Sequence, residues 1–197
     1  MVTETVTPRI FPLEPPHDSE VDAQLQAMMP AGMPPIGLFR TLVRNLPMAE
    51  AMGPWGRYEL SRRLSLSMRD REIVIDRTCV RCGCEYEWGV HVAFFAERAG
   101  LDADQLASLV TGDGEDECWN DNRDRLLIRA VDALHDHADI DDALWRQLSA
   151  EFGDASLLDL LFLCGWYHAI SFVARAARVS LEAGAPTFGS IAVGRRS

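Results

Sequence analysis

One stretch of twenty residues brings together three cysteines, two well-placed glutamates and one histidine. In chain order these residues are Glu72, Cys79, Cys82, Cys84, Glu87 and His91. Thiols, carboxylates and imidazoles are the side chains that perform nucleophilic, redox and proton-transfer chemistry near neutral pH. The site is therefore expected within this stretch, and the remaining elements are expected to position it.

Four residues of the stretch share one face of the helix that is predicted to begin near Cys84. Positions i, i+3, i+4 and i+7 of that helix are Cys84, Glu87, Trp88 and His91. Glu87 and His91 can then share a proton, and the positive end of the helix dipole favours a thiolate at Cys84 in the first turn. Glu72 lies twelve residues before Cys84 on the preceding helix, and a tight turn would fold it against the same site. This arrangement predicts a relay of thiol, carboxylate and imidazole.

The whole chain is predicted to be α-helical, because apolar residues recur at helical spacing and no alternating pattern of any length appears. Capping residues, glycines and prolines predict helices over residues 18–28, 36–45, 47–63, 67–82, 84–99, 101–110, 121–137 and 141–151, and from Asp154 onward. The short connections favour antiparallel packing in one all-α bundle over residues 18–197. Residues 1–17, which contain four prolines, are expected to form an extended arm.

The composition of the chain limits its partners. Its 197 residues are 48% hydrophobic, enough for a substantial core, and its net charge of −11 disfavours a nucleic-acid or anionic-membrane partner. The N-terminus lacks the basic and apolar regions of a signal peptide, so a cytoplasmic location and reduced thiols are expected. A small-molecule substrate is therefore the expected partner.

One apolar segment, residues 155–174, is about long enough to span a membrane. Asp159 and His168 interrupt it, and Arg175 and Arg178 follow directly. Because charged groups inside a membrane span are costly, we expect a helix buried at the centre of the bundle or in a subunit interface. No membrane contact is expected.

The spacing Glu72-x11-Cys84-x2-Glu87-x3-His91 resembles the motif of the carboxymuconolactone decarboxylase family, which includes alkylhydroperoxidase D-like proteins. The contexts REIVI, CEYEWGVH and AERAGL are similar to a longer branch of that family with an EYEW-x2-H motif. The resemblance extends to the arm PRIFPLEPP and to the segment GWYHAISFVARAARV. It implies a helical bundle of the alkylhydroperoxidase D-like type that assembles as a homo-oligomer.

The chain departs from the hydroperoxidase branch of the family at one position. That branch has the pattern Cys-x2-Cys-x3-His, in which a dithiol reduces peroxide while glutamate and histidine relay protons. Here Cys84 takes the place of the first cysteine and Glu87 takes the place of the second. A sulfenic acid formed at Cys84 would therefore need Cys79 or Cys82 as its resolving thiol.

Three functions remain open. The first is thiol-dependent, antioxidant reduction of a peroxide, with Cys84 as the attacking thiolate and Glu87 and His91 as proton carriers. Glu72 would orient His91. The second is decarboxylation of a lactone, or a related acid–base reaction of aromatic catabolism, run by the same glutamates and histidine. The third is a family member without catalytic activity. No cofactor and no metal are expected.

The clustered cysteines have two further interpretations. Zinc could bind at Cys79, Cys82, Cys84 and His91, although this spacing is not a common zinc pattern and a helix break divides the set. The thiols could also be buried packing, with Glu87 and His91 forming only an intrahelical pair.

The signals outside the stretch are weaker. Trp88 and His168 are candidates for a pocket wall, although a histidine in an apolar helix is more often a core residue with a backbone partner. His135 and His137 are expected at a solvated helix end. Packing alone is expected of three methionines: Met28, Met29 and Met33.

Overall fold

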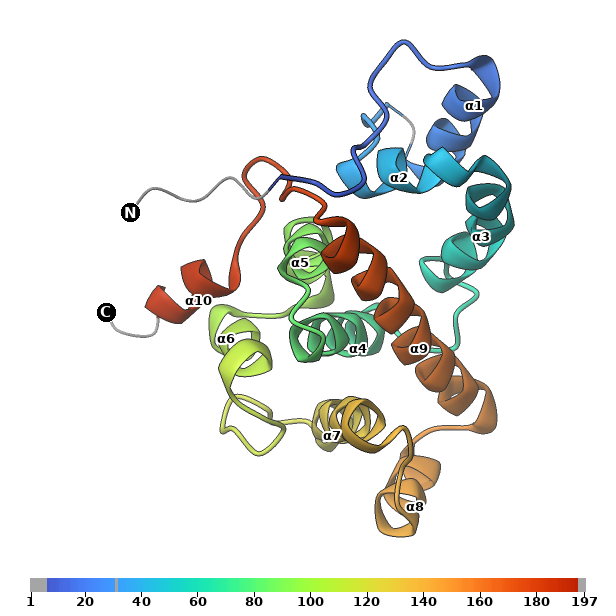
Figure 1. Cartoon of the computed structure of the whole chain (residues 1–197). Coiled ribbons are helices and arrows are strands. Elements are labelled where there is room, and N and C mark those ends of the chain that lie inside the picture. Colours follow the sequence, from blue (N-terminus) through green and yellow to red (C-terminus); the bar gives the residue numbers. More distant parts are fainter. Residues whose placement is uncertain (1–6, 31, 195–197) are drawn as a thin grey trace.

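The structure is a computed structural model that describes residues 7–30 and 32–194, with side chains through Ile191. The described residues form a bundle without a strand, so the predicted all-α class is confirmed (Figure 1). The helices are α1 (Ser19–Met28), α2 (Gly37–Leu42), the 3-10 helix η1 (Val43–Asn45), α3 (Leu46–Glu59), α4 (Met68–Arg81), α5 (Glu85–Ala99), α6 (Ala103–Thr111), α7 (Asn122–His137), α8 (Asp142–Glu151), α9 (Asp154–Ala177) and α10 (Phe188–Gly194).

Helix α4 lies at the centre of the bundle, where α5, α7 and α9 pack around it (Figure 1). Ser67 begins this helix as predicted. Its hydroxyl accepts a hydrogen bond from the Asp70 backbone N–H at 3.1 Å, and the Asp70 carboxylate accepts one from the Ser67 N–H at 2.9 Å. The residues from Asp70 to Cys79 are all buried, so Glu72 lies in the interior of the protein.

A tight turn after α4 reverses the chain and leads into α5. Gly83 has a φ of +64°, a left-handed conformation that glycine adopts without strain, and the Cys84 N–H donates to the Cys79 carbonyl at 2.7 Å. Cys84 is the N-cap of α5 and not a residue of its first turn. Because the turn lays α5 against α4, Glu72 and His91 come within hydrogen-bonding distance, as predicted.

The longest helix, α9, packs against both α4 and α5. Gly153 is its N-cap, so the predicted cap at Asp154 is wrong by one residue. Among the residues searched, α9 is the one helix long and apolar enough to cross a membrane. Half of its most apolar window is buried inside the fold. Packing within the bundle thus accounts for much of its apolar composition.

Two further elements differ from those expected. Helix α3 ends at Glu59, four residues before the predicted end at residue 63. The short helix α10 has no counterpart among the expected elements. It packs against α6, and the centroid of the Phe188 ring lies 5.1 Å from that of the Trp88 ring. Contacts with the rest of the protein, more than local sequence, therefore hold this helix.

The described part of the N-terminal arm lies on the body of the protein. Residues 7–17 contain no helix, and residues 1–6, the rest of the expected arm, lie outside the described range. The backbone N–H groups of Arg9 and Ile10 both donate to the carbonyl of Ala177, at the end of α9.

Candidate active site

Glu72 on α4 and His91 on α5 form a buried hydrogen-bonded pair. Oε2 of Glu72 lies 2.8 Å from Nδ1 of His91, and the two side chains are 0% and 4% exposed. The other carboxylate oxygen, Oε1, accepts a hydrogen bond from Nε of Arg71 at 2.6 Å. Since a carboxylate accepts the Nδ1 proton of the imidazole, it fixes the orientation of the ring and leaves Nε2 with a lone pair.

The second ring nitrogen of His91 faces Tyr167 on α9. The tyrosine hydroxyl lies 3.0 Å from Nε2, and the two rings meet edge to face. Burial raises the pKa of Tyr167 well above its usual value, and the Glu87 charge adds to this. The phenol therefore stays neutral and can donate to Nε2. The sequence reading missed Tyr167, whose signal is a hydroxyl within the apolar run between Trp166 and His168.

Glu87 approaches the same nitrogen from one turn earlier in α5. Its Oε1 lies 3.7 Å from Nε2 of His91, beyond hydrogen-bonding distance, and its Oε2 has no partner among the described residues. Burial raises the pKa of Glu87, and the proximity of His91 partly opposes this. Glu87 therefore keeps its proton to a higher pH than an exposed glutamate does, as suits a general acid.

A cavity of about 360 Å³ opens beside these groups, and Glu87, His91 and Tyr167 all line it. Its volume lies in the range of small-molecule sites. The rest of the wall is mostly apolar and comes from five helices, with contributions from Met28, Phe39, Met52, Phe94 and Trp166. The arrangement can therefore hold a small, largely apolar molecule against three proton-carrying side chains.

The three clustered thiols do not line this cavity. All three are free and buried. Burial raises the pKa of Cys84, and the charge of Glu87 adds to this. Desolvation therefore opposes the thiolate that the helix N-terminus is expected to favour at Cys84. Burial also raises the pKa of Cys82, and raises that of Cys79 well above its usual value.

The two residues expected as pocket walls lie elsewhere. Trp88 is fully buried against Phe188, and His168 donates from Nδ1 to the Cys164 carbonyl at 2.8 Å. His168 thus has the backbone partner that was the alternative expectation. Conversely, Met28 and Met29, expected only to pack, contribute to the cavity wall.

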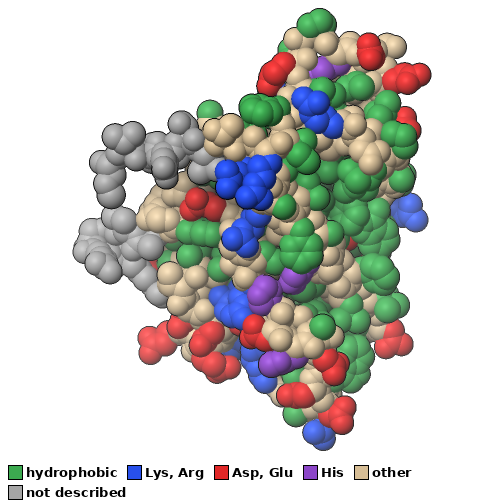
Figure 2. Space-filling view, viewed as in Figure 1, with side chains coloured by type: hydrophobic (Ala, Val, Ile, Leu, Met, Phe, Trp, Pro, Cys, Tyr) green, Lys and Arg blue, Asp and Glu red, His purple; other side chains and the backbone are tan. Residues whose placement is uncertain are grey.

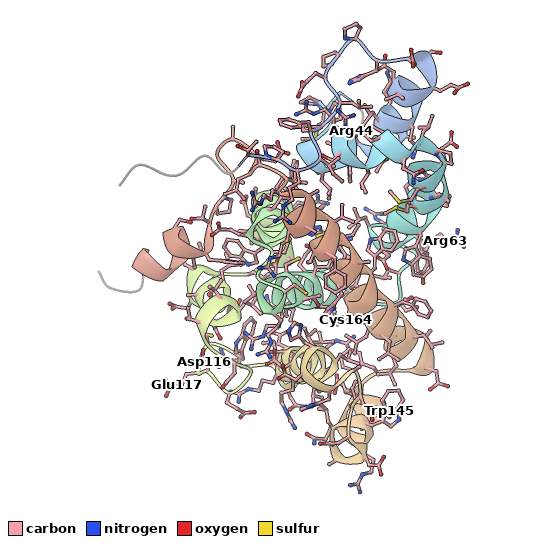
Figure 3. The ribbon with its side chains drawn as sticks, viewed as in Figure 1. Arg44, Arg63, Asp116, Glu117, Trp145 and Cys164 are labelled. Atoms are coloured by element: carbon pink, nitrogen blue, oxygen red, sulfur yellow. The ribbon has the colours of Figure 1, made fainter. Side chains whose placement is uncertain are left out.

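The zinc site suggested by sequence does not form. His91 is held by Glu72 and Tyr167, and Cys79 and Cys84 do not belong to any group of three neighbouring ligand atoms among the described residues. Cys164 is labelled in Figure 3, on α9 beside α4, where the Thr78 hydroxyl lies 3.6 Å from its sulfur.

Comparison with known proteins supports the helical fold, and one segment of the chain matches a family of known proteins. Residues 48–128 match the sequence model of the carboxymuconolactone decarboxylase family. This match covers the candidate residues on α4 and α5 and ends before α9, which carries Tyr167. No curated protein matches the chain significantly.

Two solved structures share the fold. The crystal structure of an uncharacterized peroxidase-related protein from Silicibacter sp. TM1040 superposes with a TM-score of 0.77 at 19% identity, covering 97% of this chain and 100% of that one. The debrominase Bmp8 in its apo form superposes with a TM-score of 0.62 at 14% identity, covering 88% of this chain and 92% of that one. At these identities the likeness extends to the fold alone.

Proposed function

We propose that this chain, whose residues 48–128 match the model of the carboxymuconolactone decarboxylase family, is a member of that family and an acid–base enzyme acting on a small, largely apolar carbonyl compound such as a lactone. The observation that carries this proposal is that Glu87 and His91 line one cavity together. Glu72, hydrogen-bonded behind His91, would hold the ring in place.

The proposed roles follow from the hydrogen bonds. Nε2 of His91 would act as the base, because Glu72 occupies Nδ1 and stabilises the imidazolium that forms. Glu87 would act as the acid, because burial raises its pKa and Oε2 has no partner among the described residues. Tyr167 would release Nε2 when the substrate enters and then donate to a substrate oxygen.

The cavity wall suggests the kind of substrate. Its apolar side chains suit a single ring, and Arg57 on the wall supplies a positive charge for a carboxylate. In a decarboxylation the electrons of the breaking C–C bond pass to a conjugated carbonyl and carbon dioxide leaves. Glu87 would then donate the proton that the carbanion takes up, and water would return a proton to Glu87.

A second candidate is the thiol-dependent peroxidase, which the grouping of Cys79, Cys82 and Cys84 favours. In that reaction the Cys84 thiolate attacks the peroxide, the O–O bond breaks, and sulfenic acid and an alcohol form. Cys82 or Cys79 would displace water to give a disulfide, which an external dithiol reduces. We rank this candidate second because Cys84 is fully buried, has a raised pKa and does not line the cavity.

A substrate panel separates the two candidates. Purified protein is incubated with carboxylated γ-lactones, and separately with hydrogen peroxide or cumene hydroperoxide plus dithiothreitol. The acid–base proposal predicts lactone turnover, with peroxide consumption no faster than the background. Glu97→Gln, an exposed change on the same helix as Glu87, should leave the turnover unchanged. Rapid peroxide consumption without lactone turnover would reverse the ranking.

We also propose that the protein is a cytoplasmic homo-oligomer. Figure 2 shows hydrophobic side chains gathered along the side of the molecule formed by α3 and α9. Helix α9 itself has three exposed large apolar side chains, Leu158, Phe162 and Phe172. Light scattering coupled to size-exclusion chromatography would test the assembly. A Phe162→Asp variant should form an assembly of lower mass than the wild type does if α9 lies in the interface.

A further inference from the structure

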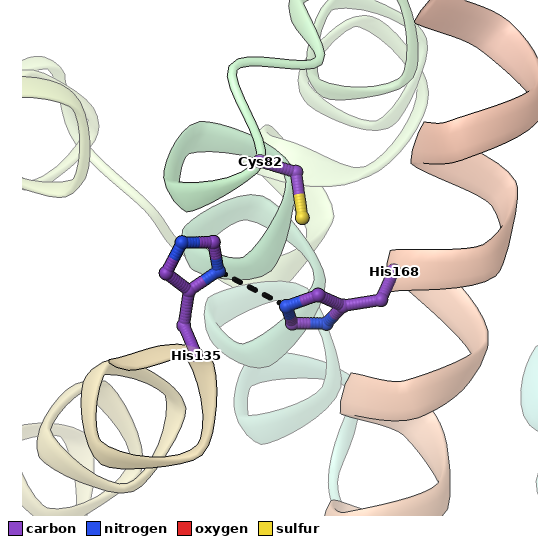
Figure 4. A group of neighbouring side chains, drawn as sticks. All are labelled: Cys82, His135 and His168. Atoms are coloured by element: carbon purple, nitrogen blue, oxygen red, sulfur yellow. Dashed lines mark hydrogen bonds between the residues drawn. The ribbon is translucent and has the colours of Figure 1, made fainter. Parts of the chain in front are cut away.

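Three side chains from distant parts of the chain converge where α4, α7 and α9 meet. Cys82 is the C-cap residue of α4, His135 lies in the last turn of α7, and His168 lies midway along α9. Their ligand atoms all lie within 4.8 Å of one another, and Nδ1 of His135 is 3.0 Å from Nε2 of His168 (Figure 4). We propose that Cys82, His135 and His168 bind a transition-metal ion, with zinc as the preferred ion.

The donor set and its spacing suit zinc. Zinc in proteins is bound by cysteine sulfur and histidine nitrogen, and tetrahedral ligands at its usual bond lengths lie roughly 3.3 to 3.8 Å apart. The separations in the cluster, from 3.0 Å to at most 4.8 Å, bracket this range. Small rotations of the three side chains are therefore enough to bring their ligand atoms to bonding distance from one ion.

The hydrogen bond behind His168 orients its ring for a metal. Nδ1 of His168 lies 2.8 Å from the Cys164 carbonyl oxygen and donates its proton there. Nε2 therefore carries the lone pair, and it points toward His135 and Cys82 (Figure 4). Metal-binding histidines almost always donate their other N–H in this way. Without a metal, the Nδ1–H of His135 donates a hydrogen bond to Nε2 of His168.

Charges around the cluster are balanced. Burial raises the pKa of Cys82, and the charge of Arg175, which donates to the Cys82 carbonyl at 2.6 Å, partly opposes this. Arg81 is also close, but it is paired with Asp132 at 3.6 Å and hydrogen-bonded to Asp136. Because Arg81 is paired with these carboxylates, its positive charge does not exclude a divalent cation from the cluster.

The cluster also has access to solvent. His135 and His168 are partly exposed, and His135 lines a polar cavity of about 360 Å³ together with Arg77 and Arg81. Water from this cavity could complete the coordination of the ion as a fourth ligand. The site is distinct from the cavity lined by Glu87, His91 and Tyr167, so it does not depend on the function proposed above.

The test is titration of chelator-treated full-length protein with Co²⁺ and Zn²⁺. Cobalt should bind at one ion per chain, with the thiolate charge-transfer band and visible bands of a tetrahedral site, and zinc should displace it. Cys82→Ser should lose the charge-transfer band. His135→Gln and His168→Gln should each weaken binding by at least about tenfold.

Matched controls keep the result interpretable. His137→Gln changes an exposed histidine two residues from His135, and Cys118→Ser changes a thiol in a loop; both should bind cobalt as the wild type does. Circular dichroism of each metal-free variant checks that it is folded. Zinc should raise the melting temperature of the wild type and not that of Cys82→Ser. Absence of binding to the wild type, or equal binding by Cys82→Ser and both histidine variants, would overturn the proposal.

Discussion

Glu72 and His91 lie nineteen residues apart in sequence, yet Oε2 of Glu72 is 2.8 Å from Nδ1 of His91 in the interior of the protein. Each residue sits on its own helix, and the turn at Gly83 brings the two helices together. The carboxylate thereby decides which ring nitrogen of His91 faces the cavity.

Replacing Glu72 with glutamine should disturb the tautomer of His91. Glutamine keeps the size of the side chain but loses the charge that stabilises a proton on Nδ1 and an imidazolium during turnover. We expect activity to fall by roughly 10²-fold or more. NMR of ¹⁵N-labelled histidine should show the proton of neutral His91 on Nδ1 in the wild type and a mixture in Glu72→Gln. A wild-type ring with its proton on Nε2 would contradict the assignment.

Tyr167→Phe removes the hydroxyl that lies 3.0 Å from Nε2 of His91 and keeps the ring. The buried nitrogen then lacks a partner, so the free energy of unfolding should fall by about 1 kcal/mol. Turnover should also fall, because the substrate loses a donor. Tyr58→Phe is the matched control: its hydroxyl bonds Asp159 at 2.6 Å, outside the cavity. If both variants lose activity equally, Tyr167 has no specific role.

The thiols should differ in their reactivity toward a disulfide reagent. Cys118 is partly exposed, whereas Cys84 is fully buried and has a raised pKa. We expect one fast-reacting thiol, absent from Cys118→Ser, with the remaining thiols reacting only as the protein opens. A fast phase that is lost in Cys84→Ser would instead support the peroxidase.

Glu59 should make stability depend on pH. Burial, with the charge of Asp159 adding to it, raises the pKa of Glu59 to about 8. The folded protein therefore keeps a proton that the unfolded chain loses, and this contribution is full below the unfolded pKa and is lost as the pH rises toward about 8. Glu59→Gln, which is neutral throughout, should gain roughly 2–4 kcal/mol relative to the wild type between those limits.

Denaturant unfolding of both proteins at several pH values measures this difference. Glu50→Gln changes an exposed glutamate on the same helix and serves as the control, for which no such trend is expected. A constant difference between Glu59→Gln and the wild type at every pH would show that Glu59 titrates normally in the folded protein.

Local signals in the sequence were sufficient for most of the fold. Ser67 and Asp70 form a capping box, Asp121 and Asp141 cap the helices expected of them, and Gly100 ends α5 in the left-handed conformation. These features depend on neighbours within a few residues, so a sequence shows them directly. Helix α10 depends on distant packing, and for this reason it was not expected.

The site was only partly predictable for the same reason. Helical spacing placed Glu87 and His91 on one face, and the tight turn expected between the two helices brought Glu72 to the same site. Tyr167 reaches His91 from another helix, and its hydroxyl within an apolar run shows a buried polar group but not the residue that it contacts. The pKa of Cys84 was predicted from the helix dipole alone, but burial in the folded protein has the larger effect.

The most direct test of the acid–base proposal is turnover of one carboxylated lactone by the wild type and three variants measured side by side. Glu87→Gln and His91→Gln should each reduce kcat/KM by roughly 10²-fold or more, and Cys84→Ser should stay within about threefold of the wild type. Loss of turnover in Cys84→Ser, with Glu87→Gln and His91→Gln still active, would contradict the account.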